Sequence, residues 1–456
     1  TLSAFIKEAG LPPDAGTSSK GDLTLERVLQ EKKVFDLSVN FEKFSIEDGS
    51  REWNKHAPGV SHTVALPTAA NILGASIESL TIEEQLSNSS VLCASTADRH
   101  LYMASPTDTE RIISSGSNLQ DSPILTYSSW DHRHMLCGSM SGKVVLYNTS
   151  TNQICDERRD HSKYVVKVAT WSANNKVLIA TAGWDSKVFL YAPSEAEVMK
   201  LGEPIASLVL PTNPEALLFV SHPDLSGEPM LLVARRDSTF LYYYRLPQSP
   251  GNTLHLLGKQ NLAPHSNAWI AFTPSSVAMC PMDASLLAVA TSAVPHMKII
   301  IVRVMYPLLK DDPSIEATLA PAAIPEAPVS ILDAADPLRP SPASQARAAL
   351  ALQDREDAAI LINCSTMAPQ TPYSTPVVVW RPDGTGVWVN SDDGVIRGIE
   401  ARTGKVVAKL EGHEAGSKIR CLWSGMVQSE NSETREEWLI SGGFDQKLII
   451  WKPKPK

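Results

Sequence analysis

The sequence contains few cysteines and no C-x-x-C pair. Six cysteines are present among 456 residues, each within an apolar run. This usage argues against a disulfide framework or a zinc site and indicates buried thiols in a reducing compartment. No run of about 18 uncharged apolar residues occurs, so we expect no membrane span. The first ten residues include a lysine and a glutamate where a secretory signal needs apolar residues, and we therefore expect a cytoplasmic or nuclear protein.

Sequence signatures of catalysis are also absent. There is no phosphate-binding G-x-x-x-x-G-K-S/T loop, no H-E-x-x-H, no G-x-S-x-G and no dinucleotide fingerprint. His132 and His134 form an H-x-H pair, but a third ligand at a suitable spacing is missing, so we interpret this segment as a solvated loop. The sequence predicts a protein that is not an enzyme and that holds no metal or cofactor.

Basic residues are fewer than acidic ones. The chain has 41 Lys and Arg against 50 Asp and Glu, which gives a formal net charge of -9. This balance argues against general binding of nucleic acid or of an anionic membrane, although it leaves a local basic face open.

A repeated unit organises most of the chain. Each copy has an apolar run, a turn with Ser, Thr or Gly followed by a polar residue, and a second apolar run, as in LIATAGWDSKVFLYA at 178–192. Seven copies align at the turn position, which is occupied by Asp98, Ser141, Asp185, Asp237, His296, Asp393 and Asp445. These positions lie 43, 44, 52, 59, 97 and 52 residues apart, close to the period of a four-stranded propeller blade. The pattern predicts an all-β fold, a seven-bladed propeller over residues 60–456.

The interval of 97 residues contains an insertion. Residues 309–357 are rich in Pro and Ala. Proline donates no ladder hydrogen bond and so cannot stand in a central strand. We therefore predict a Pro/Ala-rich insertion between blades five and six.

Two copies carry a fuller set of polar residues. They are His161, Thr181, Asp185 and Tyr191 in the third blade, and His413, Ser441, Asp445 and Trp451 in the seventh. A buried His and Asp are tolerated only when each satisfies the other. With these residues the chain resembles the WD-repeat β-propeller family over about residues 62–456. The resemblance implies that each set forms a buried hydrogen-bonded network that ties its blade together.

Closure of the ring requires a strand from the beginning of the chain. The seventh copy has only three strands of its own before the chain ends, and a missing fourth strand would leave an exposed edge. Residues 62–66 have strand composition. We predict that they pair with the last blade.

Residues 1–50 do not share the repeat. Their apolar spacing predicts two short helices joined by a loop, which form an N-terminal arm. The segment FIKEAGL is similar to the start of the LisH dimerisation helix. We expect the arm to dimerise, to dock on the propeller or to bind a partner.

The residue before each turn position is expected to lie at one mouth of the central channel. Four of these residues either belong to types that are frequent in protein interfaces or would add exposed apolar surface. They are Met140, Trp184, Arg236 and Phe444. They predict a face that binds a peptide segment of a partner. The alternative is that Trp184 and Phe444 fold over their own turns.

The sequence favours a non-enzymatic interaction scaffold, an adaptor subunit of a multiprotein complex. A substrate receptor of a cullin-type ubiquitin ligase is one alternative, because residues 130–133 resemble the W-D-x-R box of such receptors. In that family the box follows the third strand of a blade, whereas here it is expected between the first and second. A chromatin or RNA-complex subunit and a propeller hydrolase are further alternatives. A chromatin or RNA-complex subunit would need a basic face. A propeller hydrolase would need a cluster of carboxylates and histidines at the channel mouth.

Overall fold

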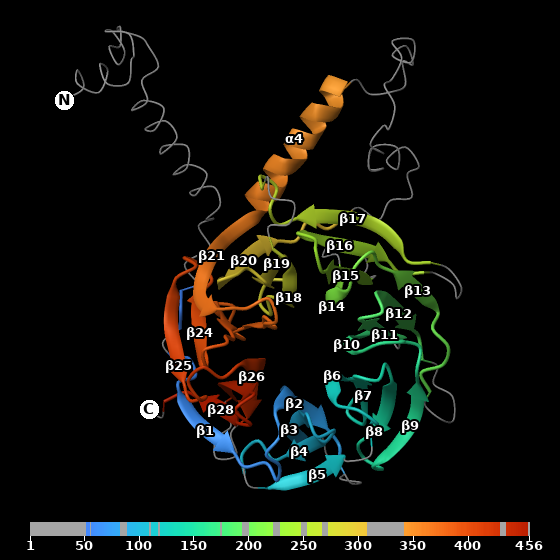
Figure 1. Cartoon of the computed structure of the whole chain (residues 1–456), viewed down its shortest axis with the longest axis vertical. Coiled ribbons are helices and arrows are strands. Elements are labelled where there is room, and N and C mark those ends of the chain that lie inside the picture. Colours follow the sequence, from blue (N-terminus) through green and yellow to red (C-terminus); the bar gives the residue numbers. More distant parts are fainter. Residues whose placement is uncertain are drawn as a thin grey trace, which may run out of the picture. The chain divides into compact units, whose positions relative to one another are not determined.

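The computed structural model describes residues 52–54, 56–82, 89–108, 111–116, 119–173, 176–193, 200–221, 229–247, 253–266, 272–307, 342–428 and 435–454. Seven antiparallel sheets of four strands each stand around a ring, as Figure 1 shows. The seven-bladed propeller predicted from the repeat is therefore present. The helices expected within residues 1–50, including the LisH-like segment, lie outside the described residues.

The strands of each blade lie side by side, in order from the inside of the ring to its rim. The innermost strands are β2 (Ile72–Leu80), β6 (Ile124–Ser129), β10 (Val165–Ala173), β14 (Pro214–Ser221), β18 (Pro274–Met279), β22 (Val378–Trp380) and β26 (Ile419–Gln428). The second strands are β3 (Ser89–Thr96), β7 (His134–Ser139), β11 (Lys176–Gly183), β15 (Pro229–Arg235), β19 (Leu286–Thr291), β23 (Gly386–Val389) and β27 (Arg435–Gly443). The third strands are β4 (Leu101–Ala104), β8 (Val144–Asn148), β12 (Lys187–Tyr191), β16 (Phe240–Arg245), β20 (His296–Arg303), β24 (Val395–Glu400) and β28 (Leu448–Lys452). The outer strands are β5 (Ile112–Gly116), β9 (Gln153–Arg158), β13 (Ala206–Val209), β17 (His255–Asn261), β21 (Ile360–Pro369), β25 (Val406–Glu411) and β1 (Val60–Val64).

Burial explains why the second strands are continuous apolar runs. Every residue of β7, β19 and β23 is buried, because neighbouring blades cover both faces of each sheet. The outer strand β9 has no buried residue. The core therefore lies between blades, and each blade depends on its neighbours.

The innermost strands share an irregularity near their first residue. In six blades the register with the second strand skips one position, at Leu73, Leu125, Val166, Glu215, Ser275 and Arg420. A bulge of this kind bends a strand and redirects a side chain. Each bulge lies near the start of an innermost strand, opposite the turn that joins the second and third strands of the same blade.

The last blade is completed by the first strand of the described chain. β1 pairs antiparallel with β28, with Val60 opposite Lys452 and Val64 opposite Leu448. The strand thus begins two residues before the stretch 62–66 that we expected. Val64 is 4% exposed and packs in a core cluster shared by the first and last blades.

The Pro/Ala-rich insertion lies within blade five, which corrects its expected position between blades five and six. It separates β20 from β21, and these two strands pair with each other. Its last part is helical, because α4 spans Pro342–Ala359 and leads directly into β21 (Figure 1). The Glu356 carboxylate accepts a hydrogen bond of 2.7 Å from the Asn261 backbone N–H and so ties the end of α4 to β17. Composition alone could not distinguish an insertion inside a blade from a connection between blades.

Residues 52–54 dock on blade six through Trp53. The indole ring lies 4.5 Å from the guanidinium carbon of Arg381 and meets Trp388 edge to face at 5.1 Å. Glycines make room for it, because a Cβ added at Gly386 or Gly398 would lie 2.6 or 2.5 Å from the ring. No feature of the sequence pattern predicted this contact.

Arg381 is fully buried and joins blades six and seven. Its guanidinium donates to the Glu437 carboxylate at 2.6–3.2 Å, to Thr385 Oγ1 at 2.8 Å and to the Asn54 carbonyl at 3.2 Å. Burial raises the pKa of Glu437, and the Arg381 charge opposes this rise. The pair is held by several hydrogen bonds, the condition under which a buried ion pair is tolerated.

Among the described residues, no helix has both the length and the apolar character that a membrane crossing requires. The six cysteines are all free thiols. Burial raises the pKa of Cys137 and of Cys421 to about 12, so these thiols are unreactive.

Loss of β1 should impair the whole ring. A chain that begins at residue 70 lacks β1 and exposes the edge of β28, so we expect it to be insoluble or to melt well below the full chain. Solubility and thermal melting check this, with a chain that begins at residue 51 as the control. Melting of the shorter chain at the parent temperature would show that this pairing is dispensable.

Replacement of Trp53 by Ala should lower the free energy of unfolding by about 2 kcal/mol, because it leaves a void between blades and uncovers Arg381. Urea unfolding measures this change. Glu52→Ala is the control, since it removes only an exposed ion pair with Arg402 and should cost less than about 1 kcal/mol. Equal effects of the two substitutions would contradict a structural role for the Trp53 ring.

Candidate functional site

Two of the predicted interface residues, Trp184 and Arg236, contact each other. The guanidinium carbon of Arg236 lies 5.6 Å from the centre of the Trp184 ring, and the same ring stacks on that of Tyr164 with the ring centres 5.4 Å apart. Tyr164 is 38% exposed, Trp184 is half-buried and Arg236 is exposed. Trp184 contacts both other side chains at the turn end of blades three and four, and we call this group of three the stack.

A repeated backbone bond fixes the position of these residues. The N–H of the residue before the turn position donates to the carbonyl of the residue that precedes the innermost strand of the same blade. The bonds are 2.9 Å from Trp184 to Tyr164, 2.8 Å from Arg236 to Asn213, 3.0 Å from Met140 to Pro123 and 2.9 Å from Phe444 to Lys418. The predicted residues therefore stand on a rigid frame.

Arg236 connects the stack to a group of charged residues on the innermost strands. Arg236 donates to a Glu215 carboxylate oxygen from Nε at 2.9 Å and pairs with the same oxygen through Nη2 at 2.7 Å. Glu215 in turn lies within electrostatic reach of Lys167 on β10 and of Arg420 on β26. We name this set the mouth site, which comprises Tyr164, Trp184, Arg236, Glu215, Lys167 and Arg420.

Burial shifts the pKa of three charged groups of the mouth site. Burial lowers the pKa of Lys167, and the Arg420 charge lowers it further. Burial also lowers the pKa of Arg420 and raises that of Glu215, although the nearby cations oppose the rise at Glu215. An electrostatic contact with a ligand is stronger here than on an open surface.

Met140 and Phe444 stand apart from this stack. Among the described residues, no ring contact, hydrogen bond or ion pair joins either side chain to Trp184. Phe444 is 43% exposed and Met140 is half-buried. The sequence pattern thus selected two residues that the fold brings together and two that it does not. The sequence pattern did not identify the other residues of the mouth site, which lie on or next to the innermost strands. They are Tyr164, Lys167, Glu215 and Arg420.

The polar residues of the seventh blade lie together as one network. His413 Nδ1 is 3.0 Å from the Asp445 carboxylate and Nε2 is 2.7 Å from Ser441 Oγ, which also accepts from Trp451 Nε1 at 2.8 Å. Because the Asp445 carboxylate can only accept, the proton of neutral His413 is on Nδ1, and the Ser441 hydroxyl donates to Nε2. Hydrogen bonds from the Glu414 N–H and from His413 outweigh the effect of burial and lower the pKa of Asp445.

The third blade has the corresponding network with one extension. His161 Nδ1 is 3.0 Å from Asp185 and Nε2 is 2.9 Å from Thr181 Oγ1. The Tyr191 hydroxyl, in place of an indole, donates to Asp160 at 2.9 Å. Both nitrogens of each histidine are occupied, so these networks are structural and leave no free acid or base.

Most other blades use a hydroxyl where these two use histidine. Thr96 and Ser391 donate to the turn residues Asp98 and Asp393, and Ser139 lies 3.1 Å from Ser141. In blades three and seven this position, two residues before the turn Asp, is Gly183 or Gly443. A Cβ there would lie 2.4 Å from His161 or 3.0 Å from His413. The glycine is thus the sequence signal that separates a histidine-locked blade from a hydroxyl-locked one.

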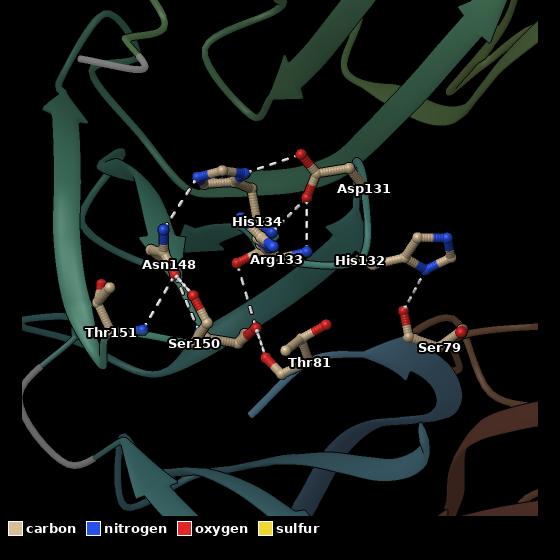
Figure 2. Close-up of polar contacts among 10 residues, drawn as sticks. Ser79, Thr81, Asp131, His132, Arg133, His134, Asn148, Ser150 and Thr151 are labelled. Carbon is tan, nitrogen blue, oxygen red and sulfur yellow. Dashed lines mark hydrogen bonds and ion pairs between the residues drawn. The ribbon is translucent and has the colours of Figure 1, made fainter. Parts of the chain in front are cut away.

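The H-x-H segment is a structural turn between β6 and β7 (Figure 2). His134 Nδ1 is 2.8 Å from Asp131 and Nε2 is 3.2 Å from Asn148, while His132 Nδ1 lies 3.1 Å from the Ser79 carbonyl. Asp131 also accepts from the Arg133 and His134 N–H groups. The two imidazole rings point in different directions in Figure 2. Within the described ranges no three His, Cys, Asp or Glu side chains are placed to hold a metal ion.

The W-D-x-R segment occupies the same turn. Its residues lie between the first and second strands of blade two, as the sequence predicted. The Thr81 N–H donates to the His132 carbonyl at 2.6 Å and Thr149 Oγ1 donates to the Thr81 carbonyl at 2.7 Å, so the turn ties blade two to blade one. These contacts give the segment a structural role.

Comparison with known proteins supports the architecture. A family model described as UCP007778, beta-propeller domain, matches residues 50–452. The match includes Trp53 and the closing strand β1, in addition to all seven blades. No curated protein matches the chain.

Stability should fall as the pH falls from about 7 to about 5, because burial lowers the pKa of His161 and His413. Below the ordinary histidine pKa of about 6.5, the unfolded chain takes up protons that the folded chain does not. His161→Asn or His413→Asn should each reduce the slope of unfolding free energy against pH by up to about 1.4 kcal/mol per pH unit. Urea unfolding across this pH range measures the slope. An unchanged slope in both variants would contradict neutral buried histidines.

Proposed function

The chain belongs to this beta-propeller family, and we propose that it acts as a non-enzymatic scaffold that binds protein partners at the mouth site. The stack of Tyr164, Trp184 and Arg236 carries the proposal. Trp, Tyr and Arg are the residues that most often dominate the energy of protein interfaces. Here they are partly exposed and held by backbone bonds, so binding would immobilise few additional groups.

The closed ring suits this function. Its blades are buried against one another, while turns and loops can vary at the ends of the strands. We propose further that the protein is a divergent WD-repeat propeller, in which blades three and seven keep the His, Ser/Thr and Asp network. Blades one, two and six have a shorter hydroxyl link in its place.

The polar networks support a role without catalysis. A general base needs a ring nitrogen or a carboxylate that can reach a substrate. The histidines of blades three and seven use both nitrogens within the blade, and His134 does so between Asp131 and Asn148. All six thiols are free and four of them are buried, which supports the cytoplasm or the nucleus as the compartment.

Trp184→Ala combined with Arg236→Ala should abolish capture of the partner and leave the melting temperature nearly unchanged. The reason is that both side chains are partly exposed. Affinity capture of the tagged full chain at its natural abundance, followed by mass spectrometry, identifies partners. Binding of the purified partner to each variant then measures the loss.

Arg133→Ala is the control, because it removes an exposed arginine at the opposite end of blade two. It should keep the partner. Retention of the partner by the Trp184 and Arg236 variant would contradict the proposal. A cullin adaptor that is captured by the parent and lost with Arg133→Ala would favour the ligase-receptor alternative instead.

A further inference from the structure

Blade four carries a row of aromatic rings and cations that contact one another. The guanidinium carbon of Arg235 lies 4.9 Å from the centre of the Tyr242 ring, and Nη2 of Arg235 donates to the Tyr242 hydroxyl at 2.7 Å. The Tyr242 and Phe240 ring centres are 6.2 Å apart, and Lys259 Nζ lies 4.8 Å from the centre of the Phe240 ring. The row therefore crosses the blade from β15 through β16 to β17.

This row is joined to the mouth site. Arg235 and Arg236 are consecutive, and Thr212 contacts both of them. Arg235 Nη1 donates to Thr212 Oγ1 at 3.0 Å, and the Thr212 hydroxyl donates to the Arg236 carbonyl. Arg236 in turn contacts the Trp184 ring. We name the whole series the aromatic–cation strip, which comprises Trp184, Arg236, Arg235, Tyr242, Phe240 and Lys259.

The strip is open to solvent along its length. Lys259 is exposed, and Arg235, Tyr242 and Phe240 are half-buried. Tyr242 packs against the same core cluster as Ala206 of β13, so this face of blade four is turned toward blade three. β13 has four residues and β17 has seven, so the outer strand of blade three covers only part of the facing sheet. Rings and cations are thus accessible to a ligand at the rim between the two blades.

The charges of the strip are not neutralised within the fold. Among the residues that the structure describes, neither Arg235 nor Lys259 forms an ion pair. Their contacts are with ring faces and with the neutral hydroxyl groups of Thr212 and Tyr242. A guanidinium group has five N–H donors and an ammonium group has three, so both cations can bind a further acceptor. The strip is therefore complementary in charge to an acidic ligand.

We propose that the aromatic–cation strip binds an extended, acidic segment of a partner protein. Carboxylates of the segment pair with Arg235 and Lys259, and its apolar side chains contact the rings that lie between these cations. The proposal rests on the proposed scaffold function, and it adds the chemistry of the partner and its path from the channel mouth to the rim. Trp, Tyr and Arg supply most of the strip, as they do in the centres of protein interfaces.

A protein segment fits the strip better than a nucleic acid does. Binding of a polyanion depends on the number of phosphates that Lys and Arg neutralise. The row on blade four offers two cations for this purpose, because Arg236 is already paired with Glu215. The net charge of -9 also repels a polyanion.

Fluorescence anisotropy with the full chain tests the proposal. The probes are capped, fluorescein-labelled peptides of Gly, Leu and Glu, and Gln replaces Glu in a neutral peptide of equal length. The Glu peptide should bind at least about tenfold more tightly than the Gln peptide, and added salt should reduce this difference. A labelled thymidine oligonucleotide is the probe for nucleic acid, and its tighter binding would overturn the proposal.

Arg235→Met combined with Lys259→Met should remove the preference for the Glu peptide, because both charges are lost while apolar stems still cover the rings. Lys259→Met alone changes an exposed position, so it should weaken the preference and leave the melting temperature nearly unchanged. The matched control is Arg111→Met combined with Lys409→Met, which removes the same charges from exposed positions in blades one and six. This control should keep the preference.

Equal binding of the Glu and Gln peptides by the parent chain would contradict the proposal, as would a full preference in either strip variant. If the double variant melts well below the parent, the Lys259→Met result decides. A partner that is lost by the Trp184 and Arg236 variant but kept by the Arg235 and Lys259 variant would leave the scaffold function standing and remove the strip from it.

Discussion

Closure of the ring through the pairing of β1 with β28 is the constraint on which the rest of the structure depends. Each blade is only four strands wide and hides its apolar faces against the next blade, so no blade has a complete core of its own. An open ring would expose both a sheet edge and the faces of two blades. The docking of Trp53 between Arg381 and Trp388 adds a second tie close to the closing strand.

Within this frame, five blades secure the turn between their second and third strands with one of two kinds of polar link. Where glycine stands two residues before the turn Asp, a histidine from the preceding loop occupies the freed volume. Where serine or threonine stands there, the hydroxyl contacts the turn residue directly. Of these five blades, only blades three and seven show the full His, Ser/Thr and Asp set.

A rigid frame of this kind positions the mouth site. The turns hold Trp184 and Arg236 in contact, and Arg236 pairs with Glu215 on the innermost strand of blade four. Lys167 and Arg420 also lie on innermost strands, those of blades three and seven. The site therefore combines residues that no single blade contains.

The amino-acid sequence by itself determined the number of blades, the position of most turns and the two histidine networks, because these depend on local patterns that recur at a fixed spacing. It also predicted that a strand at about residues 62–66 pairs with the last blade, and β1 does so. The tertiary structure alone decided that the insertion lies inside blade five, that Trp53 packs on Arg381, and that Trp184 meets Arg236 while Met140 and Phe444 stand apart. Those contacts join residues of different blades or distant segments, and their distances follow from ring closure and from bulges that no periodic pattern records.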